Sequence, residues 1–421
     1  MFVIAWQVRD APVLVTIPAR VWDTRLPLPT TIGIQTENMQ LYTHPLDDSG
    51  RFLIYRPLLG LAFVGNRAMS EICQSVAKDR MEEQTDRESE AIRFLESIGF
   101  LQDDPPPPIR TSILFQPTLA VLLMTNRCQL RCIYCYAAAG ELPGLDLSKE
   151  IGRTAIDTVY NNAQEQGANF FEVSFHGGGE PSLAWMTLQA CTQYARQKPL
   201  PCRITLTSNG IWSKQQRDWI LANMDGVSLS MDGRAETQNR RRPFVSGSES
   251  FPTVWENLTE MDKRGFESAI RLTAAEPWNE FPKEIEFLCR ETNCKKFHVE
   301  PTFHIQRGTH GDPLAGEGQS FVDAFLEALE IAGNAGRELV YSGARVGLIT
   351  DTFCTAPYQA LIVNPRGQLV SCYELAGQSH PMSEISVIGE LQEKQFILDE
   401  ETRNKLHGLL ETRRNTCEGC F

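Results

Sequence analysis

The sequence predicts an α/β protein with a series of βα units at its centre, a small α+β domain before them and a cysteine-containing extension after them. Three observations carry this prediction. Strand-like and helix-like segments alternate through residues 111–340, four consecutive prolines at 105–108 precede them, and spaced cysteines return within 341–421. Because a proline run cannot continue a helix or a central strand, we place the first boundary there and assign 1–110 to the N-terminal domain.

The N-terminal domain is expected to combine strands with a helix. Short β-like runs lie at 13–17 and 52–55, and a charged helical stretch covers 78–99. These residues leave two interpretations open: an accessory domain without a specific function, and a domain that recognises a partner.

The alternation after the prolines has a regular form. Short apolar runs fit buried parallel strands at 119–124, 171–175, 204–207, 226–231, 269–273 and 296–300. Helical stretches fall between them, at 148–166, 183–197, 214–224, 251–265 and 281–291. Successive βα units imply a parallel sheet with right-handed crossovers, either open or curved into a barrel. In both forms functional residues are expected at the carboxyl ends of the strands.

The composition restricts the class of partner. The chain has 53 acidic and 40 basic residues, which gives a formal charge of −13. This charge argues against nucleic acid or an anionic membrane surface as the main partner. No apolar run approaches the ~18 residues of a membrane-spanning helix and the N-terminus lacks a basic segment, so we expect a cytoplasmic protein. In that reducing compartment the twelve cysteines indicate metal binding or catalysis rather than disulfides.

Three of these cysteines directly follow the first strand of the barrel. Cys128, Cys132 and Cys135 have the spacing C-x3-C-x2-C in a single loop, so their thiolates can converge on one metal centre. A zinc site or an ordinary [4Fe–4S] cluster takes a fourth protein ligand. The next cysteine, Cys191, lies inside a predicted helix. The loop therefore predicts a centre with one open position, where a substrate or cofactor can bind.

With Tyr134 before the third cysteine, the loop reads C-x3-C-x-aromatic-C, and the chain resembles the radical S-adenosylmethionine (radical SAM) superfamily. The resemblance implies that the βα units form a partial (β/α)6 TIM-like barrel of the radical SAM type. It also implies that Cys128, Cys132 and Cys135 hold a catalytic [4Fe–4S] cluster whose fourth iron is chelated by S-adenosyl-L-methionine (SAM). One electron, from a donor such as flavodoxin or ferredoxin, then cleaves SAM to a 5′-deoxyadenosyl radical that abstracts hydrogen from the substrate. Tyr134 is counted among the cofactor-binding residues.

The ends of the next three strands carry further motifs of this superfamily. The second strand runs into a G-G-E-P element, the third into Thr207-Ser208-Asn209-Gly210, and the fourth into a segment similar to S-x-D-G-P-x-E-x-H-D-x-x-R. The resemblance assigns SAM binding to residues in all three, namely Gly178, Gly179, Glu180, Ser208, Asn209, Ser230, Asp232 and Arg242. In the last motif Arg234, Gln238 and Asn239 replace the proline, histidine and aspartate, so histidine-dependent roles do not carry over.

For some residues at the strand ends, the sequence leaves both a functional and a purely structural interpretation open. The Asn-Gly pair after the third strand also fits a simple turn. On the fifth strand, Arg271 and Thr273 are candidates for the SAM pocket, and an ordinary strand is the equal alternative.

The extension resembles the opening of the SPASM domain, which binds auxiliary [4Fe–4S] clusters. It contains C-x12-G-x4-C followed by C-x2-C, so the implied metal ligands are Cys354, Cys372, Cys417 and Cys420. Either a full SPASM domain is cut short at the C-terminus, or these four thiolates hold one cluster as in the shorter twitch extension. Zinc at the four-cysteine site is the non-redox alternative.

The SPASM resemblance implies a peptide substrate. Residues 45–101 resemble, weakly, the winged-helix domains that bind precursor peptides in such enzymes. Sulfatase maturases have an aspartate after the cysteine that matches Cys372, and Tyr373 stands there instead, which argues against that activity. The expected function is therefore maturation of a ribosomally made peptide, with formation of a crosslink. A twitch-type oxidation of a small molecule and a non-catalytic iron–sulfur or zinc protein are the alternatives.

Overall fold

The computed structural model describes residues 2–7, 12–17, 39–46, 50–78, 86–106, 114–302, 307, 318–344, 354–374 and 383–416. The chain divides into two compact units. The first is built chiefly from Met1–Thr111, and the second from Ser112–Ala344 with Cys354–Glu418. Each unit is described by itself.

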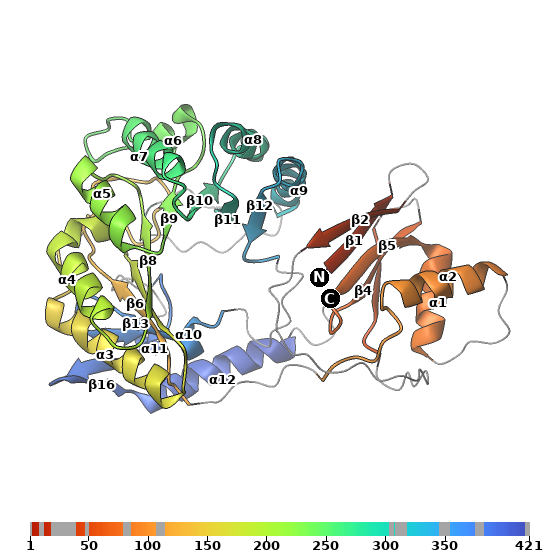
Figure 1. Ribbon diagram of the computed structural model, residues 1–421, viewed down its shortest axis with the longest axis horizontal. Coiled ribbons are helices and arrows are strands. Elements are labelled where there is room, and N and C mark those ends of the chain that lie inside the picture. Colours follow the sequence, from red (N-terminus) through yellow and green to blue (C-terminus); the bar gives the residue numbers. More distant parts are fainter. Residues whose placement is uncertain are drawn as a thin grey trace. The chain divides into compact units, whose positions relative to one another are not determined.

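The first unit combines small antiparallel sheets with two helices (Figure 1). Its elements are β1 (Phe2–Gln7), β2 (Pro12–Ile17), β3 (Tyr42–Pro45), β4 (Arg51–Arg56), β5 (Leu61–Asn66), α1 (Arg67–Ala77) and α2 (Asp86–Ser97). Asn66 caps α1 by accepting a hydrogen bond from the Met69 backbone N–H at 2.9 Å. The helical stretch expected over 78–99 corresponds to α2, and α1 precedes it as a second helix that the sequence did not predict.

The second unit contains one large sheet with the order β12-β11-β10-β9-β8-β7-β6-β13-β14-β15-β16. All six predicted strands are present as β6 (Leu119–Leu123), β7 (Phe171–His176), β8 (Cys202–Ser208), β9 (Gly226–Ser230), β10 (Ser268–Ala274) and β11 (Lys296–Pro301). Neighbouring members of this series pair in parallel. The α/β fold with a partial barrel is therefore confirmed.

The parallel series is longer than the six strands expected. β12 (Glu338–Tyr341) pairs in parallel with β11, and β13 (Ala360–Val363) pairs in parallel with β6 at the opposite end. β14 (Gln368–Val370), β15 (Val387–Gln392) and β16 (Gln395–Leu398) then continue the sheet in antiparallel fashion. The C-terminal extension is thus built into the barrel sheet.

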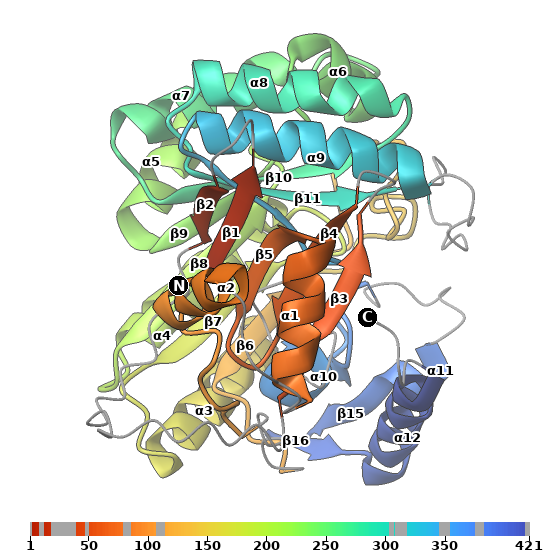
Figure 2. The ribbon, with the colours of Figure 1, turned by 90° about the vertical axis from the view of Figure 1, so that its right-hand side faces the viewer.

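Helices cover the outer face of the curved sheet (Figures 1 and 2). The longer ones are α3 (Lys149–Glu165), α4 (Trp185–Arg196), α5 (Lys214–Asn223), α7 (Phe251–Lys263), α8 (Phe281–Glu291), α9 (Gly318–Asn334) and, in the extension, α12 (Glu400–Thr416). Local sequence explains their starts. The Ser148 hydroxyl accepts from Ile151 N at 3.1 Å, and Ser213 with Gln216 forms a reciprocal capping box on α5.

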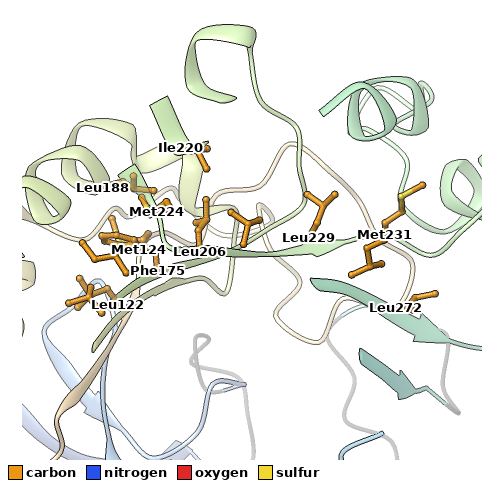
Figure 3. Packing of buried hydrophobic residues seen from close by; sticks show 14 of the residues in the cluster. Leu122, Met124, Phe175, Leu188, Leu206, Ile220, Met224, Leu229, Met231 and Leu272 are labelled. Carbon is orange, nitrogen blue, oxygen red and sulfur yellow. The ribbon is translucent and has the colours of Figure 1, made fainter. Parts of the chain in front are cut away.

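The two faces of the sheet differ in chemistry. Outward-facing strand residues such as Phe175, Leu206 and Leu229 pack with helix residues into the main hydrophobic core (Figure 3). The alternate residues face inward, and on β7 to β11 they are mostly polar. This inner row includes Ser174, His176, Thr205, Thr207, Ser228, Ser230, Arg271, Thr273, His298 and Glu300. A polar inner face suits a ligand-binding lumen rather than a packed interior.

β6 differs from its neighbours on this inner face. Val121 and Leu123 form a second buried cluster with Ile362 and Val370 from the extension. Cys372 and Tyr373 pack against the same cluster. The extension therefore covers one end of the inner face and places these two residues there.

Candidate functional site

The cysteine loop follows β6 and is tied to the end of β7. The Gly179 N–H donates to the Thr125 carbonyl at 2.9 Å, and the Glu180 N–H donates to the Arg127 carbonyl at 2.8 Å. A Cβ on Gly179 would lie 2.1 Å from the Arg127 carbonyl oxygen, so only glycine fits there. The G-G-E-P element and the cysteine loop are thus packed backbone against backbone. The glycine at 179 is required by this contact within the protein.

Two arginines donate hydrogen bonds to backbone carbonyls of the cysteine loop. Arg131 donates to the carbonyls of Cys128 at 2.9 Å and Gly140 at 3.0 Å. Arg307, which follows β11, donates to the Cys132 carbonyl at 2.8 Å and the Ala139 carbonyl at 3.0 Å. It also forms an ion pair with Glu141 at 2.6 Å. Sequence reasoning did not single out either arginine, because no motif marks them and Arg307 lies 175 residues from Cys132.

The three predicted cluster ligands are free, partly exposed thiols. The Cys128 sulfur accepts hydrogen bonds from Leu130 N at 3.4 Å and from the Asn209 side-chain amide at 3.7 Å. Burial raises the pKa of Cys128 to about 12 and that of Cys132 to about 11. These two thiols are therefore protonated in the protein alone, and binding to iron must displace the protons.

Glu180 connects the ends of β7 and β8. Its carboxylate accepts from the Ser208 hydroxyl at 2.7 Å, from Asn209 N at 2.8 Å and from Ser182 N at 3.0 Å. Burial raises the pKa of Glu180, and these hydrogen bonds oppose that shift. The structure thus brings together three residues predicted to bind SAM. Glu180 and Ser208 use their side chains to position Asn209 under the cysteine loop, and their contact with a cofactor stays a prediction.

Tyr134, Asp232 and Arg242 form a second predicted group that the structure brings together. The Tyr134 hydroxyl donates to Asp232, and the Arg242 guanidinium lies 3.1 Å from the Asp232 carboxylate and 5.3 Å from the Tyr134 ring centre. Asp232 is 1% exposed and Arg242 is 8% exposed. Burial acts to lower the pKa of Arg242, but Asp232 and its other neighbours hold that pKa above its usual value. Through Tyr134, the ion pair connects the cysteine loop to the segment that follows β9.

Two further hydrogen bonds hold Asp232 in position. Its N–H donates to the Gln238 side-chain oxygen at 2.9 Å, and its carboxylate accepts from Thr273 N at 3.1 Å. Gln238 replaces the histidine of the family segment and here supports the aspartate. Ser230 lies on the inner face of β9, opposite Arg271 in register. Gly178 lies in the turn after β7. Cofactor contacts of Gly178 and Ser230 also stay predictions.

Further side chains meet on the inner face of the sheet, and of these only Arg271 was named from the sequence as a candidate. His176 at the end of β7 packs its ring 5.2 Å from that of Tyr373. Arg271 on β10 acts electrostatically on both, and on Tyr136 from the cysteine loop. Burial and Arg271 lower the pKa of His176 to about 4. Strand alternation could have indicated this group, since His176 and Arg271 occupy inward positions.

The extension brings two of its four predicted ligands near each other. Cys354 acts on the pKa of Cys372, which burial raises. The Cys354 sulfur accepts from Ala356 N and the Cys372 sulfur from Glu374 N, both at 3.5 Å. Cys417 and Cys420 lie outside the described residues.

The residues present fit iron–sulfur clusters. The sulfurs of Cys128, Cys354 and Cys372 each accept a hydrogen bond from the backbone N–H two residues later, and such bonds tune cluster thiolates. Among the described residues, no three His, Cys, Asp or Glu side chains are gathered as ligands of one metal ion. In an iron–sulfur cluster each thiolate binds its own iron, so three thiols on one loop suit such a cluster.

Comparison with known proteins agrees with this chemistry. Residues 122–288 match the radical SAM superfamily. Fe-coproporphyrin III synthase of Methanosarcina barkeri is 24% identical over 238 residues, which are 56% of this chain and 56% of that protein. An uncharacterised protein of Methanocaldococcus jannaschii is 29% identical over 133 residues, 31% of this chain and 43% of that protein. The matches thus span about half the length of these curated relatives.

The solved structure of anSMEcpe shows the same fold. Native anSMEcpe with bound AdoMet superposes with a TM-score of 0.57 at 19% identity, over 72% of this chain and 86% of that chain. Streptococcus suis SuiB bound to the precursor peptide SuiA gives a TM-score of 0.48 at 15% identity, over 78% of this chain and 81% of that chain. Within the described residues, no helix is long and apolar enough to span a membrane.

Proposed function

We propose that the protein, whose residues 122–288 match the radical SAM superfamily, is a peptide-modifying radical SAM enzyme. One observation carries the proposal: three free thiols on a single loop stand over the ends of β7 and β8, where Glu180 positions Asn209 against Cys128. When bound there, a [4Fe–4S] cluster and SAM supply a 5′-deoxyadenosyl radical by one-electron cleavage of SAM.

The protein's own residues then have distinct tasks. Cys128, Cys132 and Cys135 hold the cluster, and the amide of Asn209 orients the first of them. The buried Asp232–Arg242 pair holds the loop through the hydroxyl of Tyr134. The polar inner face of β7 to β11 receives the substrate below the loop.

The peptide substrate is supported by the fold and by the extension. The structures of anSMEcpe include complexes with the peptides Kp18Cys and Cp18Cys, which superpose with TM-scores of 0.55 and 0.54. In this chain Cys354 and Cys372 are near each other, and Cys372 packs on the inner face of β6. An auxiliary cluster at this pair would supply an electron acceptor, which crosslink formation from a substrate radical requires. We assign recognition of a precursor peptide to the first unit.

A small molecule is the second candidate substrate. The specific observation in its favour is the match to Fe-coproporphyrin III synthase, whose name gives a tetrapyrrole rather than a peptide. The same loop and lumen would serve either substrate, since both need only a substrate carbon held near the cysteine loop.

The first experiment tests SAM cleavage. Anaerobically reconstituted protein, incubated with SAM and dithionite, is expected to release 5′-deoxyadenosine, measured by liquid chromatography and mass spectrometry. Cys128→Ala should abolish the release because it removes a cluster ligand. Cys289→Ala is the matched control, since Cys289 is a free thiol on α8 away from the loop. A wild-type protein that carries its cluster and does not cleave SAM would contradict the proposal.

The second step identifies the substrate class. A short peptide encoded beside this gene is co-expressed with the enzyme and its mass measured. A loss of two hydrogens is expected for a crosslink, and Cys372→Ala should prevent it while retaining SAM cleavage. An unchanged peptide together with active SAM cleavage would favour the small molecule.

A further inference from the structure

Arg271 lies on the inner face of the sheet, on β10. On β10 its neighbours Ile270 and Leu272 are buried in the core on the helix side, so Arg271 points the opposite way. Its side chain is exposed, although its strand lies between two others. In register it stands between Ser230 on β9 and His298 on β11. A solvent-accessible guanidinium in the middle of a sheet means that the lumen is open at this level.

This guanidinium has no bonded partner. The backbone carbonyl of Arg271 accepts a hydrogen bond from Met231 N at 3.0 Å, but within the described part of the chain the side chain of Arg271 makes no hydrogen bond and no ion pair. Arg203 gives a direct comparison, because it is an exposed arginine on the same inner face. Arg203 lies 3.9 Å from Glu172 and 3.5 Å from Glu267, so its charge is compensated by two carboxylates.

The groups that face Arg271 do not compensate its charge. They are His176 from β7, His298 from β11, Tyr136 from the cysteine loop and Tyr373 from the extension. The two imidazoles are neutral at pH 7, since burial and nearby cations lower the pKa of each histidine to about 4. The carboxylate of Glu374 also acts on Tyr136, but no ion pair connects it to Arg271.

We propose that Arg271 is the binding residue for a carboxylate of a ligand held in the lumen. The planar guanidinium fork matches a carboxylate in two parallel hydrogen bonds. Neutral His176 and the hydroxyl of Ser230 lie on the same inner face as further hydrogen-bonding groups. The inference rests on the proposed function, because that function places SAM and the substrate at the inner face of the sheet.

The carboxylate has two sources with the same chemistry: the amino-acid end of SAM, and an acidic side chain of the substrate. Arginine-specific modification distinguishes them. Reconstituted full-length protein is treated anaerobically with phenylglyoxal, and adducts at Arg271 and Arg203 are followed over time by peptide mapping. The probes are SAM, the tripeptide acetyl-Gly-Glu-Gly-amide and its Gln counterpart.

The expected result is slower modification of Arg271, by threefold or more, with at least one carboxylate probe. Protection by SAM assigns the site to the cofactor. Protection by the Glu peptide, without protection by the Gln peptide, assigns it to the substrate. Arg203 should react at one rate throughout, because its partners are protein carboxylates. If no probe protects Arg271, or if the Glu and Gln peptides protect it equally while SAM does not, the inference is wrong.

Variants give an independent binding measurement. Arg271→Gln should weaken binding of the protecting probe about 10- to 100-fold, as expected for loss of a charged hydrogen-bond pair. Arg271→Lys should recover part of that loss, because lysine keeps the charge without the fork. Arg203→Gln should bind the probe as the wild type does. Equal affinity of Arg271→Gln and wild type overturns the inference.

Failure of the inference and failure of the proposed function give different results. Wild-type protein that cleaves SAM without protection at Arg271 rejects only the carboxylate site. Protein that holds a cluster without cleaving SAM rejects the proposed function, whereas modification of Arg271 is still measured.

Discussion

At the scale of single residues, Arg307 should decide how well the cysteine loop holds a cluster. Its guanidinium binds two loop carbonyls and pairs with Glu141, and its side chain is only 18% exposed. We expect Arg307→Ala to weaken cluster retention about 10- to 100-fold, the usual cost of losing a residue that orients a metal-binding loop. Iron and sulfide content after exposure to a chelator measures this effect.

A matched control separates this effect from general destabilisation. Arg264 makes ion pairs with Asp218 at 2.7 Å and Glu260 at 2.8 Å on the exposed surface, away from the loop. Arg264→Ala should keep the iron content of the wild type, since exposed ion pairs contribute little. Equal retention of iron by Arg307→Ala and wild type would show that Arg307 does not position the loop.

The same scale shows what a sequence can reveal about a site. Cysteine spacing and the G-G-E-P element identified the loop, because those residue types at those separations have few other uses. The sequence did not predict a role for Arg307 or His176, since no motif distinguishes them from other arginines and histidines. Their roles depend on which segments meet in space, and Gly179 shows the difference clearly: its need for glycine comes from the backbone of Arg127.

At the scale of elements, the pairing of β13 with β6 should attach the extension to the barrel. Ile362 on β13 is 1% exposed and lies in the cluster with Val121 and Leu123. Ile362→Ala is expected to lower the free energy of unfolding by about 2–5 kcal/mol, through lost burial and the cavity that remains. Urea unfolding followed by tryptophan fluorescence measures the change.

The extension offers its own comparison. Ile397 on β16 is 46% exposed, so Ile397→Ala should change the unfolding free energy by less than about 0.5 kcal/mol. If both variants unfold like the wild type, the β6–β13 pairing does not contribute to stability. The position of Cys372 would then need another explanation.

Element prediction succeeded where periodicity extends over several residues. α8 begins and ends at the residues expected, and β6 to β11 lie within one or two residues of theirs. β12 and β13 were not predicted because each spans four residues and pairs in parallel with a strand distant in sequence. β13 meets β6 across more than 230 residues, which no local pattern records.

At the scale of the whole molecule, side chains from the barrel, the cysteine loop and the extension meet at the polar inner face of the sheet. Sequence reasoning predicted an enzyme of this class because each segment carries its own motif. It did not predict that Tyr373 and His176 would meet, since that contact depends on how the extension joins the sheet. The roles of 1–110 and of Cys417 with Cys420 remain predictions.

Two lumen histidines should make the stability of the protein depend on pH. The pKa values of His176 and His298 are lowered from 6.5 to about 4, in both cases by burial first. Arg271 lowers both values further. Lys296 also lowers that of His298, while Glu338 opposes the shift for His298 and a hydrogen bond to Gly177 opposes it for His176. Both imidazoles are therefore neutral in the folded state at pH 5 to 7.

The sign follows from proton counting. Between pH 6.5 and 4 the unfolded chain binds more protons at these two sites than the folded chain, so unfolding becomes easier as the pH falls through this window. The upper limit is about 1.4 kcal/mol per imidazole for each pH unit, and water in the open lumen reduces it. Urea unfolding at intervals from pH 7.5 to 4.5 should show a smaller fall for His176→Gln/His298→Gln than for the wild type. Because both proteins share the same carboxylates, their difference isolates the histidines. Parallel pH profiles would mean that both imidazoles titrate in the folded lumen as they do in water, and that the lumen is more hydrated than its burial indicates.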